Sequence, residues 1–289
     1  MIDPEIDPMN KKIATIAITA IATGLLLAQQ AQATLVAAYG SDGQGTGLQT
    51  KLNPLVTAGS GDTWSGGTLS GSDYINGTVQ LGQSPLDVLW NLAGPGASAT
   101  LVLEIAGNAN NNTFGFYDPA DPTKKAQLFA GPAGTGSKLF VKFNGTQLQS
   151  SSSGLAGSFD NVGSAFGSTT FGMYLQGNGG TFYSDPSKNA GGGDNLVAYQ
   201  GFAGRTIKVN GTPTAWDANS YVLGWEDLVL SSSDHDYQDM VLLVSQIIPA
   251  LPVAGATPVP EAKSLIAGLL LLLPLGASTI RILRKNRAV

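Results

Sequence analysis

Short stretches of alternating apolar and polar residues dominate the middle of the chain. A two-residue period puts every second side chain on one face and is typical of a strand with one buried face. In the segment KLFVKF we expect Leu139, Val141 and Phe143 to point inward, and Lys138 and Lys142 to point outward. The same pattern predicts strands at 99–105, 138–143, 170–175, 196–199, 206–209, 221–225 and 239–244.

Glycine-containing turn signals separate these segments. Asn-Gly pairs at 76–77, 144–145 and 210–211 favour tight hairpin turns. Residues 84–92 are the one stretch that we expect to form a short helix, and the Gly-, Ser- and Thr-rich residues 43–71 are expected to form a loop or an edge. Many short strands joined by such turns predict an all-β, Gly-rich domain, a β-sandwich or a jelly-roll-like fold.

Composition limits what this domain can do. The 289 residues include 38 Gly and no Cys, and residues 34–260 hold 8 Lys and Arg against 16 Asp and Glu, a net charge of −8. An acidic body argues against nucleic acid as a partner, because phosphates attract Lys and Arg. Without Cys the domain has no disulfide and no Cys-based zinc site, so packing, strand pairing or a bound metal must stabilise it.

The N-terminal residues 9–33 have the three parts of a signal peptide. Lys11 and Lys12 precede an apolar run that extends to Ala28, and the segment closes with Ala31-Gln32-Ala33, a small-x-small cleavage site. We expect cleavage after Ala33 and a body at 34–248. Residues 1–8 (MIDPEIDP) are acidic and are interpreted as a leader or a misassigned start.

The C-terminal end is also organised for a membrane. A Pro-rich linker (249–260) leads into a tail (261–289), in which residues 265–280 carry no charge and are expected to form a transmembrane helix with the residues that flank them. Basic residues tend to remain on the cytoplasmic side, which would leave the body outside. The basic residues of the tail are Arg281, Arg284, Lys285 and Arg287.

This tail resembles the PEP-CTERM sorting signal of Gram-negative bacteria, which combines a Val-Pro-Glu-Pro motif, an apolar helix and an Arg-rich end. The motif reads Val259, Pro260, Glu261 and Ala262 here. The resemblance implies a membrane partner of the exosortase type, anchoring in the inner membrane during transit, and processing of the tail near the motif. It also implies display on the cell surface or in the extracellular matrix, with extracellular polysaccharide as a candidate partner.

Three segments of the body, within about 101–244, resemble a bacterial domain family of unknown function that is common in exported and PEP-CTERM proteins. They are NTFGFYD (112–118), residues 171–200 and GWEDLVLSSSDHDYQDMVLLV (224–244). The last contains the family pattern aromatic-Glu-Asp-Leu followed by Asp-x-Asp-aromatic-x-Asp. Ser232, Ser233 and Gln238 stand where that pattern has two glycines and an asparagine. The resemblance implies export and a β fold.

The acids of this last segment lie between two predicted strands. Such crowding costs Coulomb energy unless a cation or hydrogen bonds offset it, and Ca²⁺ prefers six to eight oxygen ligands. The pattern predicts a calcium site, although it lacks the spacing of an EF-hand; the alternative is a turn held by Asx hydrogen bonds. The candidate ligands are Glu226, Asp227, Asp234, Asp236 and Asp239.

No catalytic residue stands out. His235, the single histidine, is expected in solvent, and one His without Cys partners makes neither a zinc site nor, alone, a triad. We therefore predict a non-catalytic structural or adhesive protein of the cell envelope or extracellular matrix, stabilised by calcium. A carbohydrate-binding module with exposed aromatics and a polysaccharide-degrading enzyme with paired carboxylates are the alternatives. The tryptophans are expected in the core rather than stacked on sugars: Trp64, Trp90, Trp216 and Trp225.

Overall fold

The structure, a computed structural model, describes residues 48–52, 54–57, 59–60, 84, 86–103 and 109–250. These residues belong to one compact unit, 31–251. The expected signal peptide (9–33), the tail (261–289) and its apolar segment (265–280) lie outside the described residues. Within the described ranges no helix combines the length and the apolar character needed to cross a membrane.

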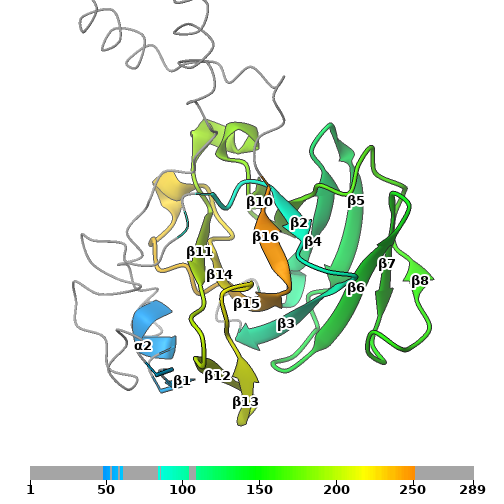
Figure 1. Cartoon of the computed structure of the whole chain (residues 1–289). Helices are drawn as coiled ribbons and strands as arrows, with labels where there is room; N and C mark the ends of the chain where they lie inside the picture. Colours follow the sequence, from blue (N-terminus) through cyan, green and yellow to red (C-terminus); the bar gives the residue numbers. More distant parts are fainter. Residues whose placement is uncertain are drawn as a thin grey trace, which may run out of the picture. The chain divides into compact units, whose positions relative to one another are not determined.

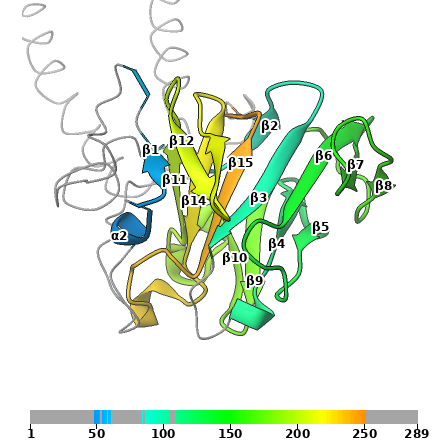
Figure 2. The same ribbon diagram turned by 90° about the horizontal axis from the view of Figure 1, so that it is seen from below.

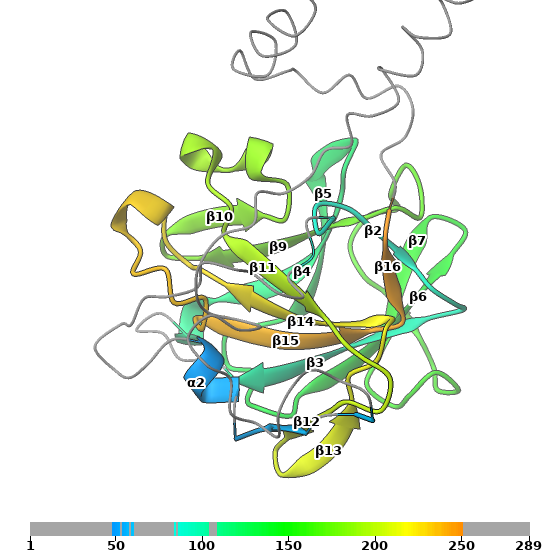
Figure 3. The same cartoon turned by 60° about the vertical axis from the view of Figure 1, so that its left-hand side comes forward.

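Two antiparallel sheets form the body (Figures 1 and 3). The four-stranded sheet has the order β10 (Gly180–Tyr183), β9 (Gly172–Gly177), β4 (Thr113–Asp118), β5 (Asp121–Phe129). The seven-stranded sheet has the order β11 (Leu196–Gln200), β14 (Ser220–Trp225), β15 (Met240–Ser245), β3 (Ala97–Leu103), β6 (Lys138–Asn144), β7 (Gln147–Ser151), β8 (Asp160–Asn161). Strands β16 (Ile247–Pro249) and β2 (Trp90–Leu92) pair separately.

The two sheets share one hydrophobic core, which is the arrangement of a β-sandwich. Phe114 and Phe116 of β4 and Leu175 of β9 belong to the same buried cluster as Leu223 of β14 and Leu242 of β15. The structure therefore confirms an all-β fold of the sandwich type.

A second buried cluster lies on the opposite face of the seven-stranded sheet, over β11, β14 and β15. The helix α2 (Leu48–Leu52) and the strands β1 (Val56–Thr57) and β12 (Thr206–Val209) supply its outer side (Figure 2). Strand β13 (Thr212–Ala215) pairs with β12 at the edge of this three-stranded sheet. Every residue of β14 is consequently buried, as are residues 240–244 of β15. These two central strands carry apolar side chains on both faces, as expected for strands that are covered on two sides.

The predicted strands are found close to their expected positions, as β3, β6, β9, β11, β12, β14 and β15. The end of the first, at Ile105, lies outside the described residues. The helix expected at 84–92 is wrong: Trp90–Leu92 forms β2, whose Trp90 exchanges backbone hydrogen bonds with Phe171 at 2.8 and 2.9 Å. Pairing with a distant strand outweighs the local preference there. Within 43–71, α2 and β1 are described.

The turns follow the glycine signals. Asn210 and Gly211 have φ of 48° and 77° and join β12 to β13, as the left-handed positions of a tight hairpin require. Gly145 and Thr146 join β6 to β7, one residue beyond the expected Asn-Gly turn, because Asn144 still pairs with Gln147. The pair at 76–77 lies outside the described residues. The outer strand β5 carries Pro122, Lys124 and Lys125.

Candidate metal centre

The predicted ligands lie in one connection, residues 226–239, which we call the acidic loop. It joins β14 to β15, the two strands that are buried on both faces. Glu226 follows the last residue of β14 directly, and a 3-10 turn (η4, Leu230–Ser232) begins the return toward β15. The most deeply packed hairpin of the domain therefore presents these acids at its closed end.

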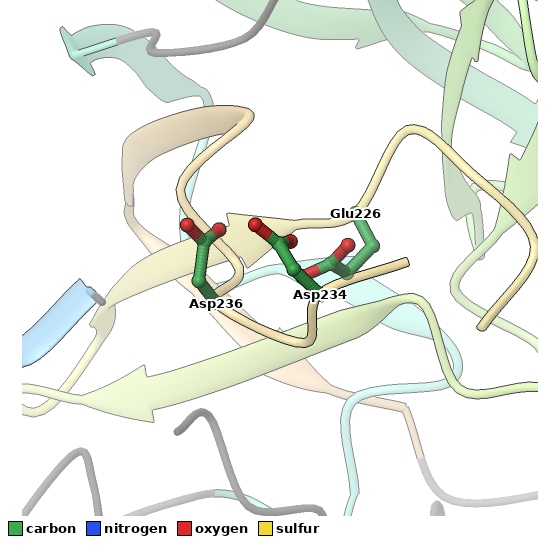
Figure 4. A group of neighbouring side chains, drawn as sticks. All are labelled: Glu226, Asp234 and Asp236. Carbon is green, nitrogen blue, oxygen red and sulfur yellow. The ribbon is translucent and has the colours of Figure 1, made fainter. Parts of the chain in front are cut away.

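Three of the five acids come together. One carboxylate oxygen from each of Glu226, Asp234 and Asp236 lies within 4.8 Å of the others, and Figure 4 shows the three side chains next to one another. We call these three residues the carboxylate cluster. Glu226 is 1% exposed and Asp236 is fully buried, whereas Asp234 is half-buried and lies at the open side.

Left-handed backbone at two positions shapes this part of the loop. His235 and Tyr237 have φ of 60° and 54°, which costs a residue other than glycine about 1–2 kcal/mol. Tyr237 is fully buried in the second hydrophobic cluster, and its hydroxyl donates to the Asp194 carbonyl at 2.8 Å. Burial of this ring thus fixes the backbone next to Asp236, between two residues in the left-handed region.

Glu226 accepts hydrogen bonds from the loop that it faces. The Ser233 hydroxyl donates to Oε2, and the Tyr237 backbone N–H donates to Oε1 at 2.7 Å. Burial raises the pKa of Glu226 to about 7, and the neighbouring Asp234 and Asp236 charges act in the same direction, whereas the two hydrogen bonds oppose it. The carboxyl is therefore stable either with a proton or beside a cation.

Asp236 is held by its neighbour Gln238. The Gln238 backbone N–H donates to Oδ1 at 3.1 Å, and its side-chain amide nitrogen donates to Oδ2. The other atom of that amide, Oε1, is buried and has no hydrogen-bond partner among the described residues. The Asp236 carbonyl accepts from the N–H of Leu48, which connects α2 to the loop at 3.2 Å.

The two remaining predicted ligands have other contacts. Asp227 is 2% exposed; its Oδ2 accepts from the Asn112 amide at 2.9 Å, and its N–H donates to Asp239 Oδ2 at 2.8 Å. Burial, followed by the Asp227 charge, raises the pKa of Asp239 to about 9. The Glu226 carboxylate faces Ser233 and Tyr237, whereas the Asp227 carboxylate faces Asn112. Asp227 and Asp239 thus form a group distinct from the carboxylate cluster.

Sequence reasoning did not identify several polar residues of this region. In the sequence, Ser233 stands out only as a departure from the family pattern, and Asn112 only as the start of a similar segment. Asn195 has no such signal. Its amide donates to the carbonyls of Glu226 and Leu228 at 3.2 and 2.6 Å. Asp194, which the sequence suggested as an addition to a cation site with Asp185, is instead buried near another buried acid, Asp87. In the sequence, the only indication that these polar residues are buried is that apolar residues lie near them in the chain.

The structure also places the single histidine and three of the four tryptophans. His235 is half-buried, and its N–H donates to the Ser233 hydroxyl at 3.0 Å. Trp90, Trp216 and Trp225 are fully buried, which confirms the core prediction for these three. Trp64 lies outside the described residues. A stacking surface for sugars is therefore not supplied by the three described tryptophans.

The carboxylate cluster fits a hard cation. Two oxygens bound to one Ca²⁺ at about 2.3–2.6 Å are separated by at most about 5 Å, which the three carboxylates satisfy. The three side-chain donors of the cluster are all carboxylate oxygens, and the Gln238 amide faces Asp236 with its nitrogen, Nε2. Soft metals prefer sulfur or imidazole ligands and have no such donor set here.

Comparison with known proteins concerns this same part of the chain. A family model described as "Domain of unknown function (DUF4114)" matches residues 132–246. The matched residues include β6 to β15 and the whole acidic loop, whereas the segment 112–118 precedes them. The expected resemblance to a domain family of unknown function is thus confirmed for 132–246. No curated protein and no solved structure shows significant similarity to the chain.

Proposed function

We propose that the protein is an exported structural or adhesive component of the cell envelope or extracellular matrix, and that one Ca²⁺ bound by the acidic loop stabilises its β-sandwich. The observation that carries the proposal is the carboxylate cluster, three acids within 4.8 Å at the closed end of the central hairpin. Two of the three are almost completely removed from water. Buried like charges at this separation require a proton or a cation.

Two further features support a stabilising rather than a catalytic ion. Glu226 and Asp236 have little exposure, so a substrate has poor access to them. The chain has no Cys from which to make a disulfide between strands. A ligand that binds only the folded state stabilises it by RT ln(1 + [L]/Kd), about 2.7 kcal/mol at a hundredfold excess over Kd.

Export is the second half of the proposal. It rests on the two ends of the chain, the signal-like residues 9–33 and the PEP-CTERM-like tail 261–289 with its motif and basic end. A protein outside the cell meets Ca²⁺ at concentrations that suit weak sites, about 10⁻⁴–10⁻³ M. Extracellular polysaccharide is the neighbour that such a protein would contact.

Calorimetric titration and thermal unfolding of the purified full chain, kept in mild detergent because of its apolar ends, test the calcium site. We expect one equivalent of Ca²⁺ to bind, and the Tm to be higher in Ca²⁺ than in EGTA. Asp236→Asn and Glu226→Gln should abolish both effects, because each removes one charged ligand. Asp160→Asn on the short strand β8 is the matched control, since Asp160 is exposed.

If the wild-type Tm is the same in Ca²⁺ and in EGTA, and no heat of binding is measured, the acidic loop is a hydrogen-bonded turn and the calcium proposal is wrong. Equal loss of binding in Asp160→Asn would instead point to a general charge effect, because that residue has no contact with the carboxylate cluster.

A further inference from the structure

Gln238 combines two properties that a structural glutamine seldom has together. Its side chain is fully buried, and its amide points at a cluster of carboxylates through the bond from Nε2 to Asp236 Oδ2. Its Oε1 nevertheless has no hydrogen-bond partner among the described residues. A buried amide oxygen without a partner costs about 1–3 kcal/mol in this orientation of the amide.

We infer that Gln238 Oε1 is a direct ligand of the cation held by Glu226, Asp234 and Asp236, and that this neutral oxygen completes the protein's share of the shell. The inference rests on the proposed calcium site. The side chain reaches it by turning its amide end for end, which exchanges Nε2 for Oε1 at the position beside Asp236. The cation then takes the place of the amide hydrogens as the partner of the Asp236 carboxylate.

Charge and ligand number agree with this role. Three carboxylates around one Ca²⁺ leave a net charge of about −1, and a neutral fourth oxygen adds a ligand without adding repulsion. Ca²⁺ accepts six to eight oxygens in irregular arrangements, whereas Mg²⁺ needs a near-ideal octahedron and keeps its waters. Filling a position with a protein oxygen from a short loop therefore favours Ca²⁺ over Mg²⁺.

A purely structural role makes the opposite prediction for one substitution. If Gln238 serves only to donate Nε2–H to Asp236, then Gln238→Glu removes the donor, sets two carboxylates against each other and weakens Ca²⁺ binding. If Oε1 is a ligand, Glu supplies an equivalent oxygen with additional charge, and Ca²⁺ binding is retained or strengthened. Gln238→Met has a similar volume without either polar atom, and it should weaken binding by about tenfold or more in the ligand case.

The experiment is calorimetric titration of the full chain with Ca²⁺ and, separately, with Mg²⁺, for wild type, Gln238→Glu and Gln238→Met. Gln149→Glu and Gln149→Met on β7 are the matched controls, because the Gln149 amide donates only to the surface residue Asn161. Near-UV circular dichroism in EGTA verifies that each variant is folded. We expect Gln238→Glu to keep Ca²⁺ affinity, Gln238→Met to lose it, and the Ca²⁺/Mg²⁺ ratio to fall in Gln238→Met.

Different results would overturn the calcium site and the role of Gln238. Absence of Ca²⁺ binding in wild type removes the site itself. Normal wild-type binding with unchanged affinity in Gln238→Met, or with weakened affinity in Gln238→Glu, overturns the role of Gln238 alone. A crystal structure of the wild-type protein with Ca²⁺ decides the matter without a variant: we expect Oε1 at about 2.4 Å from the ion, and Nε2 still facing Asp236 would contradict the inference.

Discussion

The amide nitrogen of Asn112 donates to Asp227 Oδ2 at 2.9 Å, a hydrogen bond between residues 115 positions apart. Asn112 precedes β4 of the four-stranded sheet, and Asp227 follows β14 of the seven-stranded sheet. Both side chains are buried. The bond therefore joins the two layers of the sandwich beside the carboxylate cluster.

We predict that Asn112→Ala lowers the free energy of unfolding by about 2–3 kcal/mol, because it leaves a buried carboxylate without its donor. Urea unfolding of the single variants and of the double variant with Asp227→Ala gives the coupling between the two residues. Gln149→Ala, which removes a surface amide pair with Asn161, should change stability by less than about 0.5 kcal/mol. Additive effects of Asn112→Ala and Asp227→Ala would show that the bond contributes little.

In calcium-free solution, stability should fall as the pH rises from 5 to 8. Burial raises the pKa of both Glu226 and Asp194 to about 7, above the ordinary values of 4.5 and 3.8. The folded state therefore binds more protons than the unfolded state in this range, so stability is full below the ordinary values and is lost as the pH passes about 7. Urea unfolding in EGTA at pH 5 and at pH 8 should show that the free energy of unfolding falls by about 1–3 kcal/mol.

Two comparisons separate the contributing groups. Ca²⁺ at millimolar concentration should remove the part due to Glu226, since the cation replaces the proton. Burial and the Asp194 charge raise the pKa of Asp87, whose Oδ1 has no hydrogen-bond partner in the described residues. Asp87→Asn should therefore increase stability at pH 8 by more than it does at pH 5. If the stability of the wild type in EGTA does not change between pH 5 and pH 8, the raised pKa values of these buried acids are contradicted.

Gly172 leaves room for an aromatic ring. It pairs with Tyr117 across β9 and β4, and a Cβ at Gly172 would lie 2.2 Å from two atoms of the Tyr117 ring. Gly172→Ala should destabilise the domain by about 1–3 kcal/mol through this overlap. Gly134→Ala is the control, since a Cβ there has no atom within 4 Å. Equal urea midpoints for the two variants would mean that the ring moves aside without cost.

The ends of the chain give a test of export in the native host. We predict that the mature protein begins at Thr34, because the small-x-small sequence at Ala31 and Ala33 precedes it. Replacing Ala31 and Ala33 with Leu should leave the precursor uncut. Edman sequencing of protein recovered from outside the cells is the measurement, and a start at Met1 or Met9 would contradict the signal peptide.

The basic tail has its own test. Changing Arg284, Lys285 and Arg287 to Gln should mislocalise the protein, because the basic end keeps the apolar segment oriented during transit. Lys208→Gln, on the exposed side of β12, is the matched control. Unchanged size and location of the tail variant would argue against a sorting role.

Strand positions could be predicted where one face of a strand is buried. The alternation in 138–143 identified β6 correctly, with Val141 in the core and Lys138 exposed. Strands β4 and β5 were not predicted, since TFGFYD has almost no polar alternation and β5 begins with Asp121, Pro122 and two lysines. Coverage of the central sheet by a second cluster follows from contacts with α2 and β12, which are distant in sequence.

The candidate site was predictable in residue type but not in arrangement. Counting acids between two strands gave five candidate ligands, of which three come together. The structure assigns Glu226 to the cluster with Asp234 and Asp236. The amide partners Asn112 and Gln238 could not be derived, because hydrogen bonds over 115 residues and the left-handed turns at His235 and Tyr237 depend on the folded core.

The outer strand β5, with Pro122, Lys124 and Lys125, affects whether two copies of this protein can pair through their strand edges. Proline lacks the N–H that a neighbouring strand would need, and lysines on an edge resist a second chain that carries the same charges. At the other sheet, β8 has two residues, too few to template a continuous ladder. When copies are concentrated on one surface, pairing through the β5 and β8 edges into fibres should therefore be disfavoured.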